Sequence, residues 1–173
     1  MNPIRLSLLP ALELIALSAG SCTPLRPRVS LQPGVSLKSY RLVVVGPVEN
    51  RTGTSFNYDV EDTLRALLRE RLEANRVPLA SDPTDATAPL LYLVSSLDEF
   101  RSGGITAQVA ILAVRSPKCV LSSRLTDGAS GQRLGEIVST NLVDQGDTPF
   151  MTPRQLLASC ARLTSDEIKR RLK

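Results

Sequence analysis

The sequence predicts an α+β fold in which two helices pack on one face of a mostly antiparallel sheet of four to six strands. Three observations predict this class: a β-branched run near position 43, two segments with apolar residues at helical spacing, and several alternating segments separated by glycine-containing turns. Hydrophobic residues make up 42% of the 173-residue chain, which is enough for one domain with one core. The expected element order is β-α-β-β-β-β-β-α.

The first predicted strand and helix follow one another directly. The strand RLVVVGPV, at 41–48, is a nearly continuous β-branched run, which is typical of a central strand that is buried on both faces. The segment 56–76 has helical periodicity, with acidic residues in its first turn, where the helix dipole favours them. The residues predicted to form its buried face are Val60, Leu64, Leu67, Leu68 and Leu72.

Five more strands are predicted before the last helix, at 77–80, 90–100, 106–114, 119–125 and 133–143. Glycines mark the reversals between them, because glycine adopts the positive φ angles that tight turns require. Two of these strands have a clear apolar face. The residues expected to point into the core are Leu91, Leu93 and Leu97 on one strand and Cys119, Leu121 and Leu125 on the other.

The last helix is predicted to begin at Thr152. This residue and Gln155 have the spacing of a capping box, and Pro153 occupies the first helical position. The predicted buried face consists of Leu156, Leu157, Cys160, Leu163 and Ile168. The helix ends in the cations Lys169, Arg170, Arg171 and Lys173. We interpret these cations as partners of the helix dipole rather than as a binding patch.

The N-terminus has the pattern of a secretory signal. Arg5 precedes the 12-residue apolar stretch LSLLPALELIAL. This stretch is shorter than the roughly 20 residues that span a bilayer. The following ALSAGSC resembles the lipobox of bacterial lipoproteins, with Ala19 where Leu is usual. The resemblance implies that residues 1–21 are a signal peptide that is removed, and that Cys22 is acylated and anchors the protein to a membrane.

Two alternatives to the lipid anchor stay open: an ordinary signal peptide followed by soluble export, and an uncleaved amphipathic helix on a soluble enzyme. With the anchor, residues 22–39 are expected to form a Pro-rich basic tether, and residues 40–173 the folded domain. The basic charges of the tether suit anionic headgroups, although a solvated linker has the same composition. The expected location is the cell envelope, facing the periplasm, at the outer rather than the inner membrane.

Catalytic chemistry finds little support in the sequence. Histidine is absent, which removes the commonest general base and transition-metal ligand. The acidic clusters at 59–62 and 98–99 have the spacing of solvated surface groups, and Gly128 and Gly131 form a hairpin turn rather than a phosphate loop. Aromatic residues are only 3% of the chain, too few for a nucleic-acid platform. We therefore expect no catalytic residues, no metal, no cofactor and no nucleic acid.

Cys119 and Cys160 are expected to point into the same core, one from a strand and one from the last helix. In an oxidising compartment they could form a disulfide, which would close a loop of about 40 residues. Two free core cysteines, packed as small apolar side chains, fit the sequence equally well. Both alternatives stay open at this point.

Four segments together resemble uncharacterised bacterial envelope lipoproteins with a small α+β domain of unknown function. They are YRLVVVGPVEN, LRALLRERLEANRV, APLLYLVSSLDEFRSGG and SSRLTDGASGQRLGEI, with Leu91 to Gly103 and Asp127 to Gly131 matching the family's strand and hairpin patterns. The architecture is also distantly similar to the lipopolysaccharide-assembly lipoprotein, although Thr23 and Pro24 follow Cys22 where that family has Gly and Phe. These resemblances imply an anchored, non-catalytic domain that binds an envelope protein or component, or that serves as an accessory subunit of an outer-membrane assembly or export machine. Phe100 and Phe150 are the candidate contact residues, with core packing as the alternative.

Overall fold

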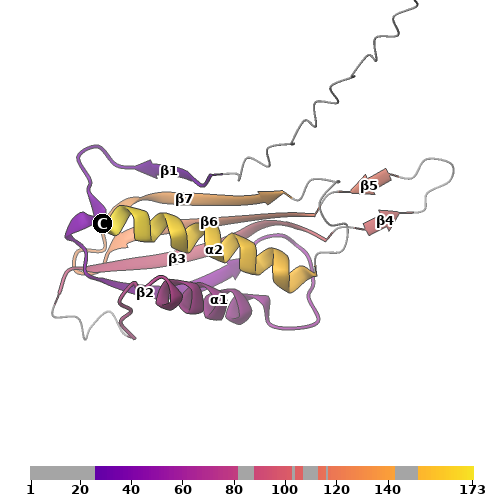
Figure 1. Ribbon diagram of the computed structural model, residues 1–173, viewed down its shortest axis with the longest axis horizontal. Helices are drawn as coiled ribbons and strands as arrows, with labels where there is room; N and C mark the ends of the chain where they lie inside the picture. Colours follow the sequence, from indigo (N-terminus) through magenta and orange to yellow (C-terminus); the bar gives the residue numbers. More distant parts are fainter. Residues whose placement is uncertain (1–25, 82–87, 103, 107–112, 116, 143–151) are drawn as a thin grey trace, which may run out of the picture.

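The computed structural model describes residues 26–81, 88–102, 104–106, 113–115, 117–142 and 152–173. Their main feature is a two-layer sandwich, in which helices α1 and α2 lie side by side over one face of a five-stranded sheet (Figure 1). The sheet has the order β1-β7-β6-β3-β2, and only β2 and β3 pair in parallel. The strands are β1 (Arg28–Leu31), β2 (Leu42–Asn50), β3 (Leu90–Arg101), β6 (Lys118–Asp127) and β7 (Arg133–Leu142). The predicted α+β class is therefore confirmed.

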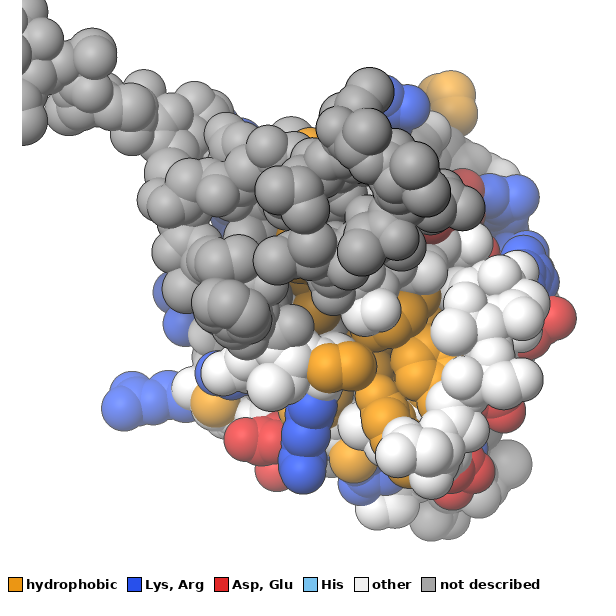
Figure 2. Space-filling view, turned by 90° about the vertical axis from the view of Figure 1, so that its right-hand side faces the viewer, with side chains coloured by type: hydrophobic (Ala, Val, Ile, Leu, Met, Phe, Trp, Pro, Cys, Tyr) orange, Lys and Arg blue, Asp and Glu red, His pale blue; other side chains and the backbone are white. Residues whose placement is uncertain are grey.

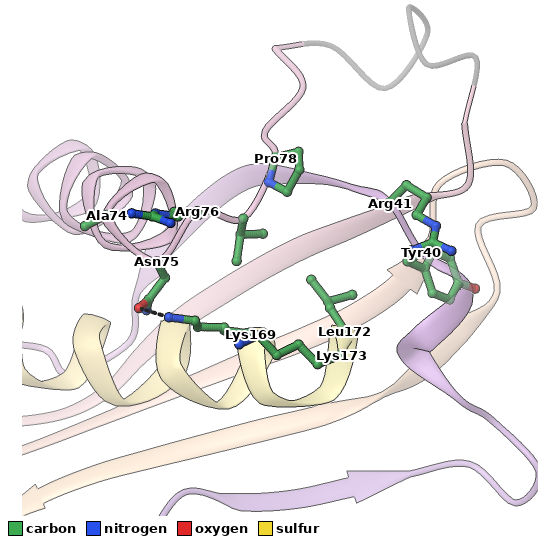
Figure 3. A pocket seen from close by; sticks show the side chains of 10 residues that line it. Tyr40, Arg41, Ala74, Asn75, Arg76, Pro78, Lys169, Leu172 and Lys173 are labelled. Atoms are coloured by element: carbon green, nitrogen blue, oxygen red, sulfur yellow. Dashed lines mark hydrogen bonds between the residues drawn. The ribbon is translucent and has the colours of Figure 1, made fainter.

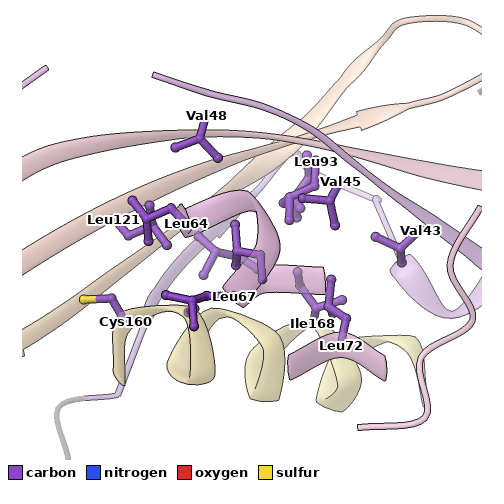
Figure 4. Packing of buried hydrophobic residues seen from close by; sticks show 14 of the residues in the cluster. Val43, Val45, Val48, Leu64, Leu67, Leu72, Leu93, Leu121, Cys160 and Ile168 are labelled. Carbon is purple, nitrogen blue, oxygen red and sulfur yellow. The ribbon is translucent and has the colours of Figure 1, made fainter. Parts of the chain in front are cut away.

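The core lies between this sheet and the helices α1 (Val60–Ala74) and α2 (Pro153–Leu172). All five residues predicted for the buried face of α1 are buried, and so are the predicted core residues of β3 and β6. Aliphatic side chains from the two helices and the sheet interdigitate in one continuous cluster (Figure 4). Burial of each such Leu stabilises the fold by roughly 1.5–3 kcal/mol.

The expectation that 41–48 is a central strand is wrong, because β2 lies at one end of the sheet order. Its β-branched residues are buried nevertheless, since Val43 and Val45 pack under the helices. The outer edge of β2 is also partly covered. Val43 donates a backbone hydrogen bond to Pro78 and accepts one from Ala80, so the predicted strand at 77–80 is only a single parallel bridge at Leu79.

The prediction that 106–114 forms a strand of the main sheet is also wrong. The described residues on either side of 107–112 are β4 (Gly104–Thr106) and β5 (Ala113–Arg115), which pair with each other in a separate two-stranded sheet. Residues 107–112 themselves lie outside the described part of the chain. This small sheet lies at the end of the molecule opposite the end of α2 (Figure 1).

Residues from Arg28 onward contribute to the fold, whereas the folded domain was expected to begin near Tyr40, so much of the segment 22–39 predicted as a tether belongs to the domain. Strand β1 pairs antiparallel with β7, and a 3-10 turn, η1 (Leu37–Ser39), follows it. The side chain of Leu37 is only 1% exposed and belongs to the core. Gly135 permits the pairing, because a Cβ atom there would clash with the carbonyl oxygen of Ser30.

Helix α2 begins as predicted, with the Thr152–Gln155 capping box and Pro153 in its first turn. Its predicted buried face contains one error. Leu163 is only half-buried, whereas Thr164 is fully buried. The hydroxyl of Thr164 lies 2.7 Å from that of Ser139 on β7, so a hydrogen bond makes burial of this polar residue favourable.

Candidate functional site

The predicted lipidation site, Cys22, and the predicted signal peptide 1–21 lie outside the described residues. The anchor therefore stays a prediction from the sequence. Within the described part of the chain, no helix is long and apolar enough to cross a membrane.

Cys119 and Cys160 are brought together in the core, as the sequence predicts. Both are fully buried free thiols, and the Cys160 thiol donates to the backbone oxygen of Cys119 at 3.3 Å. The pKa of the Cys119 thiol is raised, first by its hydrogen bond with Cys160 and then by burial. A protonated, inaccessible thiol is a poor nucleophile, so this geometry suits core packing or a disulfide rather than catalysis.

A cavity built by well-separated segments of the chain lies at the end of the molecule where both helices finish (Figure 3). Its volume of about 440 Å³ falls within the range of small-ligand sites. Its apolar lining includes Val77, Pro78 and Leu172. Four cationic residues also line it: Arg41 immediately before β2, Arg76 after α1, and Lys169 and Lys173 at the end of α2. We refer to this cavity as the basic pocket.

The backbone around Arg76 is unusual. Val77 donates to the carbonyl of Leu72 and Arg76 to that of Glu73, which is the hydrogen-bond pattern of a Schellman cap at the end of α1. The residue in the left-handed position of such a cap is usually glycine, yet here it is Arg76, with φ of 59°. A non-glycine residue loses about 1 kcal/mol or more in this conformation. The fold thus keeps a strained arginine on the wall of the basic pocket.

Polar contacts hold one side of the basic pocket in place. Asn75, the last cap residue of α1, donates to Ser165 and Asp166, both at 2.8 Å. Its side-chain oxygen accepts a hydrogen bond from Lys169 at 3.3 Å (Figure 3). These contacts join the ends of the two helices, so the wall between them is fixed by the fold.

The opposite side of the basic pocket is formed by Tyr40, whose hydroxyl donates to Asp127 at 2.9 Å. Burial, and then this hydrogen bond, raise the pKa of Tyr40 to about 12. The pKa of Asp127 is lowered by hydrogen bonds from the backbone and side chain of Ser130 and from Tyr40. At neutral pH the phenol is therefore neutral, the carboxylate is ionised, and Asp127 is already engaged by its own hairpin.

A second, smaller hollow of about 330 Å³ lies beside the end of α2, lined in part by Leu37, Lys38, Arg170 and Arg171. The charges of its two arginines are balanced by a neighbouring carboxylate. Arg170 and Arg171 each lie 2.7 Å from the buried carboxylate of Glu167. Burial would raise the pKa of Glu167, but the hydrogen bonds and charges of the arginines outweigh it and lower that pKa. The four cations of the basic pocket, by contrast, have no ion pair within the described residues.

The acidic clusters do not form a catalytic pair. Asp59 caps α1, bonding the backbone of Asp62, while Glu99 is bound to Lys118 at 2.6 Å. Asp98 accepts a hydrogen bond from Ser122 across the strands. Among the residues that the structure describes, no three acidic or cysteine side chains are grouped as metal ligands.

At the opposite end of the molecule, hydrophobic side chains gather in a hollow (Figure 2). This end carries an aromatic cluster of Phe56, Tyr58 and Phe100, with ring centroids of Phe56 and Phe100 5.0 Å apart. Phe100 also packs against the core, so core packing accounts for this candidate contact residue. Phe150, the other candidate, lies outside the described residues.

Comparison with known proteins identifies the fold rather than a family. No protein-family model matches the chain, and no curated protein matches it. Among solved structures, it is similar to the PelC dodecamer from Paraburkholderia phytofirmans, with a TM-score of 0.52 and 17% identity over 80% of this chain and 94% of that one. At this identity the similarity shows a shared fold alone.

Two more solved structures have lower scores. A DUF330 protein from Xanthomonas campestris has a TM-score of 0.45 and 14% identity, over 85% of this chain and 89% of that one. A minor lipoprotein from Acinetobacter baumannii has a TM-score of 0.38 and 13% identity, over 76% of this chain and 91% of that one. The expected similarity to the lipopolysaccharide-assembly lipoprotein is not shown by these comparisons.

Sequence reasoning missed the basic pocket. Lys169 and Lys173 were expected only to complement the helix dipole, and Arg41 and Arg76 carry no motif. The pocket exists because the parallel course of α1 and α2 brings both helix ends to the start of β2. One signal was available: Asn75-Arg76 stands after the last apolar residue of the first helix, where glycine is the usual stop.

Proposed function

We propose that this protein is a lipid-anchored, non-catalytic binding domain of the bacterial cell envelope, held at the membrane by an acylated Cys22 and facing the periplasm. The observation that carries the proposal is the ALSAGSC segment, which ends an apolar stretch too short to span a bilayer. In the sequence, Cys22 lies six positions before Arg28, where β1 begins. A chain anchored there would hold the sheet within a few residues' reach of the membrane.

The chemistry of the described residues supports a binding role. The buried ionisable groups Glu167, Cys119 and Cys160 are each engaged by a neighbour inside the fold. A general base or nucleophile needs a reacting atom that a substrate can reach. We therefore assign the domain to recognition of an envelope protein or component, and treat a soluble enzyme as the competing hypothesis.

The anchor is tested by comparing wild type with Cys22→Ala in the native host. Mass spectrometry of wild type from the membrane fraction should give a mature chain that starts at Cys22 and carries acyl chains. The Cys22→Ala protein should lose the acyl mass and the cleavage at that residue. A wild-type chain that starts at Met1 without added lipid would reject the anchor and favour the soluble enzyme.

As a second candidate function, the protein associates with copies of itself and serves as a subunit of an envelope assembly. The shared fold with a protein that forms a dodecamer favours it. The sheet face away from the helices supports it too, since Val94, Val120 and Val138 are only half-buried there. Sedimentation of the protein in neutral detergent should show a species several times the mass of one chain. A monomer at all concentrations would reject this second candidate.

A further inference from the structure

We infer that the basic pocket binds a phosphate-bearing ligand, with Arg76 and Lys169 as the groups that recognise the phosphate and Arg41 on the opposite side of the cavity (Figure 3). This inference goes beyond the proposed function and does not depend on the anchor. Guanidinium groups suit phosphate because their planar fork can donate two parallel hydrogen bonds, while the lysine ammonium acts as a point charge.

The distribution of charge favours an anion. Four cationic side chains line the cavity, and none of its lining residues in the described part of the chain is acidic. Asp127 and Asp166 touch lining residues, Tyr40 and Asn75, but do not line the cavity themselves. Like charges that share a cavity repel one another, and a bound phosphate would relieve that repulsion.

The helix dipole does not account for these cations. The ends of α1 and α2 together carry a partial charge of about −1, against four positive side chains at the cavity. Arg41 belongs to neither helix, since it precedes β2. In the second hollow, by contrast, Glu167 binds both Arg170 and Arg171.

The strained backbone of Arg76 is the independent observation. Glycine would complete the cap of α1 without the steric cost of a positive φ, which is 59° here. Residues held in such conformations cluster at binding sites, where the side chain is needed despite the cost. The apolar lining of Val77, Pro78 and Leu172 offers contact for the uncharged part of a ligand. The cavity thus fits a phosphate joined to a less polar group.

The test uses the full chain in neutral detergent, titrated calorimetrically with inorganic pyrophosphate. Wild type should bind, and the affinity should fall as salt is raised. Arg76→Gly and Lys169→Ala should each weaken binding by about ten-fold or more, the effect of losing one charge-assisted hydrogen bond. The matched control is Arg162→Ala, which removes an exposed arginine of α2 outside the pocket and should change affinity by less than about two-fold.

Arg76→Gly also separates binding from folding. Glycine suits the left-handed position of the cap. The melting temperature of Arg76→Gly should therefore be no lower than that of wild type, while its affinity for pyrophosphate falls. Absence of binding to wild type would overturn the inference. So would an equal loss in Arg162→Ala and Arg76→Gly, because it would show that only the total charge matters.

Vesicles distinguish a lipid headgroup from a soluble phosphate. Wild type and Arg76→Gly are each floated with phosphatidylcholine vesicles that contain or lack phosphatidic acid. Any lipid anchor contributes equally to the membrane binding of the two proteins. If phosphatidic acid increases the fraction of wild type that floats with the vesicles, but not the fraction of Arg76→Gly, the ligand is a lipid headgroup. Equal recovery, together with pyrophosphate binding, would support the pocket with a soluble phosphate as its ligand.

Discussion

Helix α1 buries five side chains, all of them Val or Leu, whereas helix α2 buries Cys160, Thr164, Ser165 and Glu167 beside its apolar residues. Each buried polar group of α2 has a defined partner. Thr164 bonds Ser139 on β7, Ser165 bonds Asn75 on α1, and the Cys160 thiol bonds the backbone of Cys119 on β6. The apolar face of α1 tolerates small shifts, because the hydrophobic effect is non-directional. Hydrogen bonds have directions, so the partners of α2 fix its position on the sheet.

The largest change in the free energy of unfolding is expected from a disulfide between α2 and the sheet. Cys119 and Cys160 are 41 positions apart, and oxidation to a disulfide should raise the free energy of unfolding by about 4 kcal/mol in the chain-entropy model. Since both thiols are buried, the bond must form before the core closes. We expect protein refolded in a glutathione redox buffer to lose the mass of two hydrogens and to unfold at higher urea than the reduced protein.

Cys160→Ala serves as the control for this prediction, because it keeps one cysteine and removes the bond. Its unfolding should not respond to reductant. Two free thiols in wild type isolated without reductant from an oxidising compartment would contradict the prediction, and free core cysteines would then be the correct interpretation.

A smaller effect is expected from the apolar face of α1. Leu68 is fully buried, so Leu68→Ala should lower the free energy of unfolding by about 3 kcal/mol through lost burial and the cavity that remains. Leu163→Ala on α2 is the matched comparison, since Leu163 is only half-buried and should lose roughly half as much or less. Urea unfolding of both variants measures the difference. Equal losses would mean that Leu163 belongs to the core after all.

The contrast between the helices also explains what the sequence could predict. The face of α1 was predicted in full because its residues are apolar and their spacing alone identifies them. On α2, hydrophobicity predicts that Leu163 is buried rather than Thr164. Thr164 is buried instead because its hydroxyl bonds Ser139, which lies on a strand distant in the sequence. The cap at Thr152 was predictable because its partner, Gln155, is three residues away.

Features that depend on distant partners were missed for the same reason. Strand β1 lies in the segment predicted as a tether because its alternating sequence, RVSL, is only four residues long and stands among prolines and basic residues. Its pairing depends on the edge of β7 and on the absence of a side chain at Gly135. The basic pocket depends on the meeting of Arg41, Arg76 and Lys169, which come from three separate segments. Local patterns indicate neither the strand with which β1 pairs nor the meeting of these three segments.

A double-mutant cycle measures how far polar contacts fix α2. Ser139→Ala and Thr164→Val should each lower the free energy of unfolding by about 1–2 kcal/mol, because each leaves a buried hydroxyl without its partner. The double variant should lose less than the sum of the two, since no unpaired hydroxyl remains. Urea unfolding of the four proteins gives the coupling. Strict additivity would show that this hydrogen bond does not stabilise the position of α2.

The smallest effect is expected from Glu167, whose pKa is lowered in the folded protein. Burial opposes that shift, and the bonds from Arg170 and Arg171 more than offset it. A carboxylate with a depressed folded pKa stabilises the fold above its unfolded pKa, and this contribution is lost as the pH falls through the folded pKa. Because Arg170 is largely exposed, Glu167→Gln should lower the free energy of unfolding at pH 7 by less than about 1 kcal/mol.

The pH dependence separates this charge effect from a change in packing. The difference between wild type and Glu167→Gln should shrink as the pH is lowered below the unfolded pKa of about 4.3, and should vanish once both proteins are uncharged at this position. Glu70→Gln, on the exposed side of α1, is the matched control and should show no such trend. If the Glu167→Gln difference stayed constant from neutral to acidic pH, shape rather than charge would hold the end of α2. The hydrogen bonds to Ser139 and Asn75 would then be sufficient to position the helix.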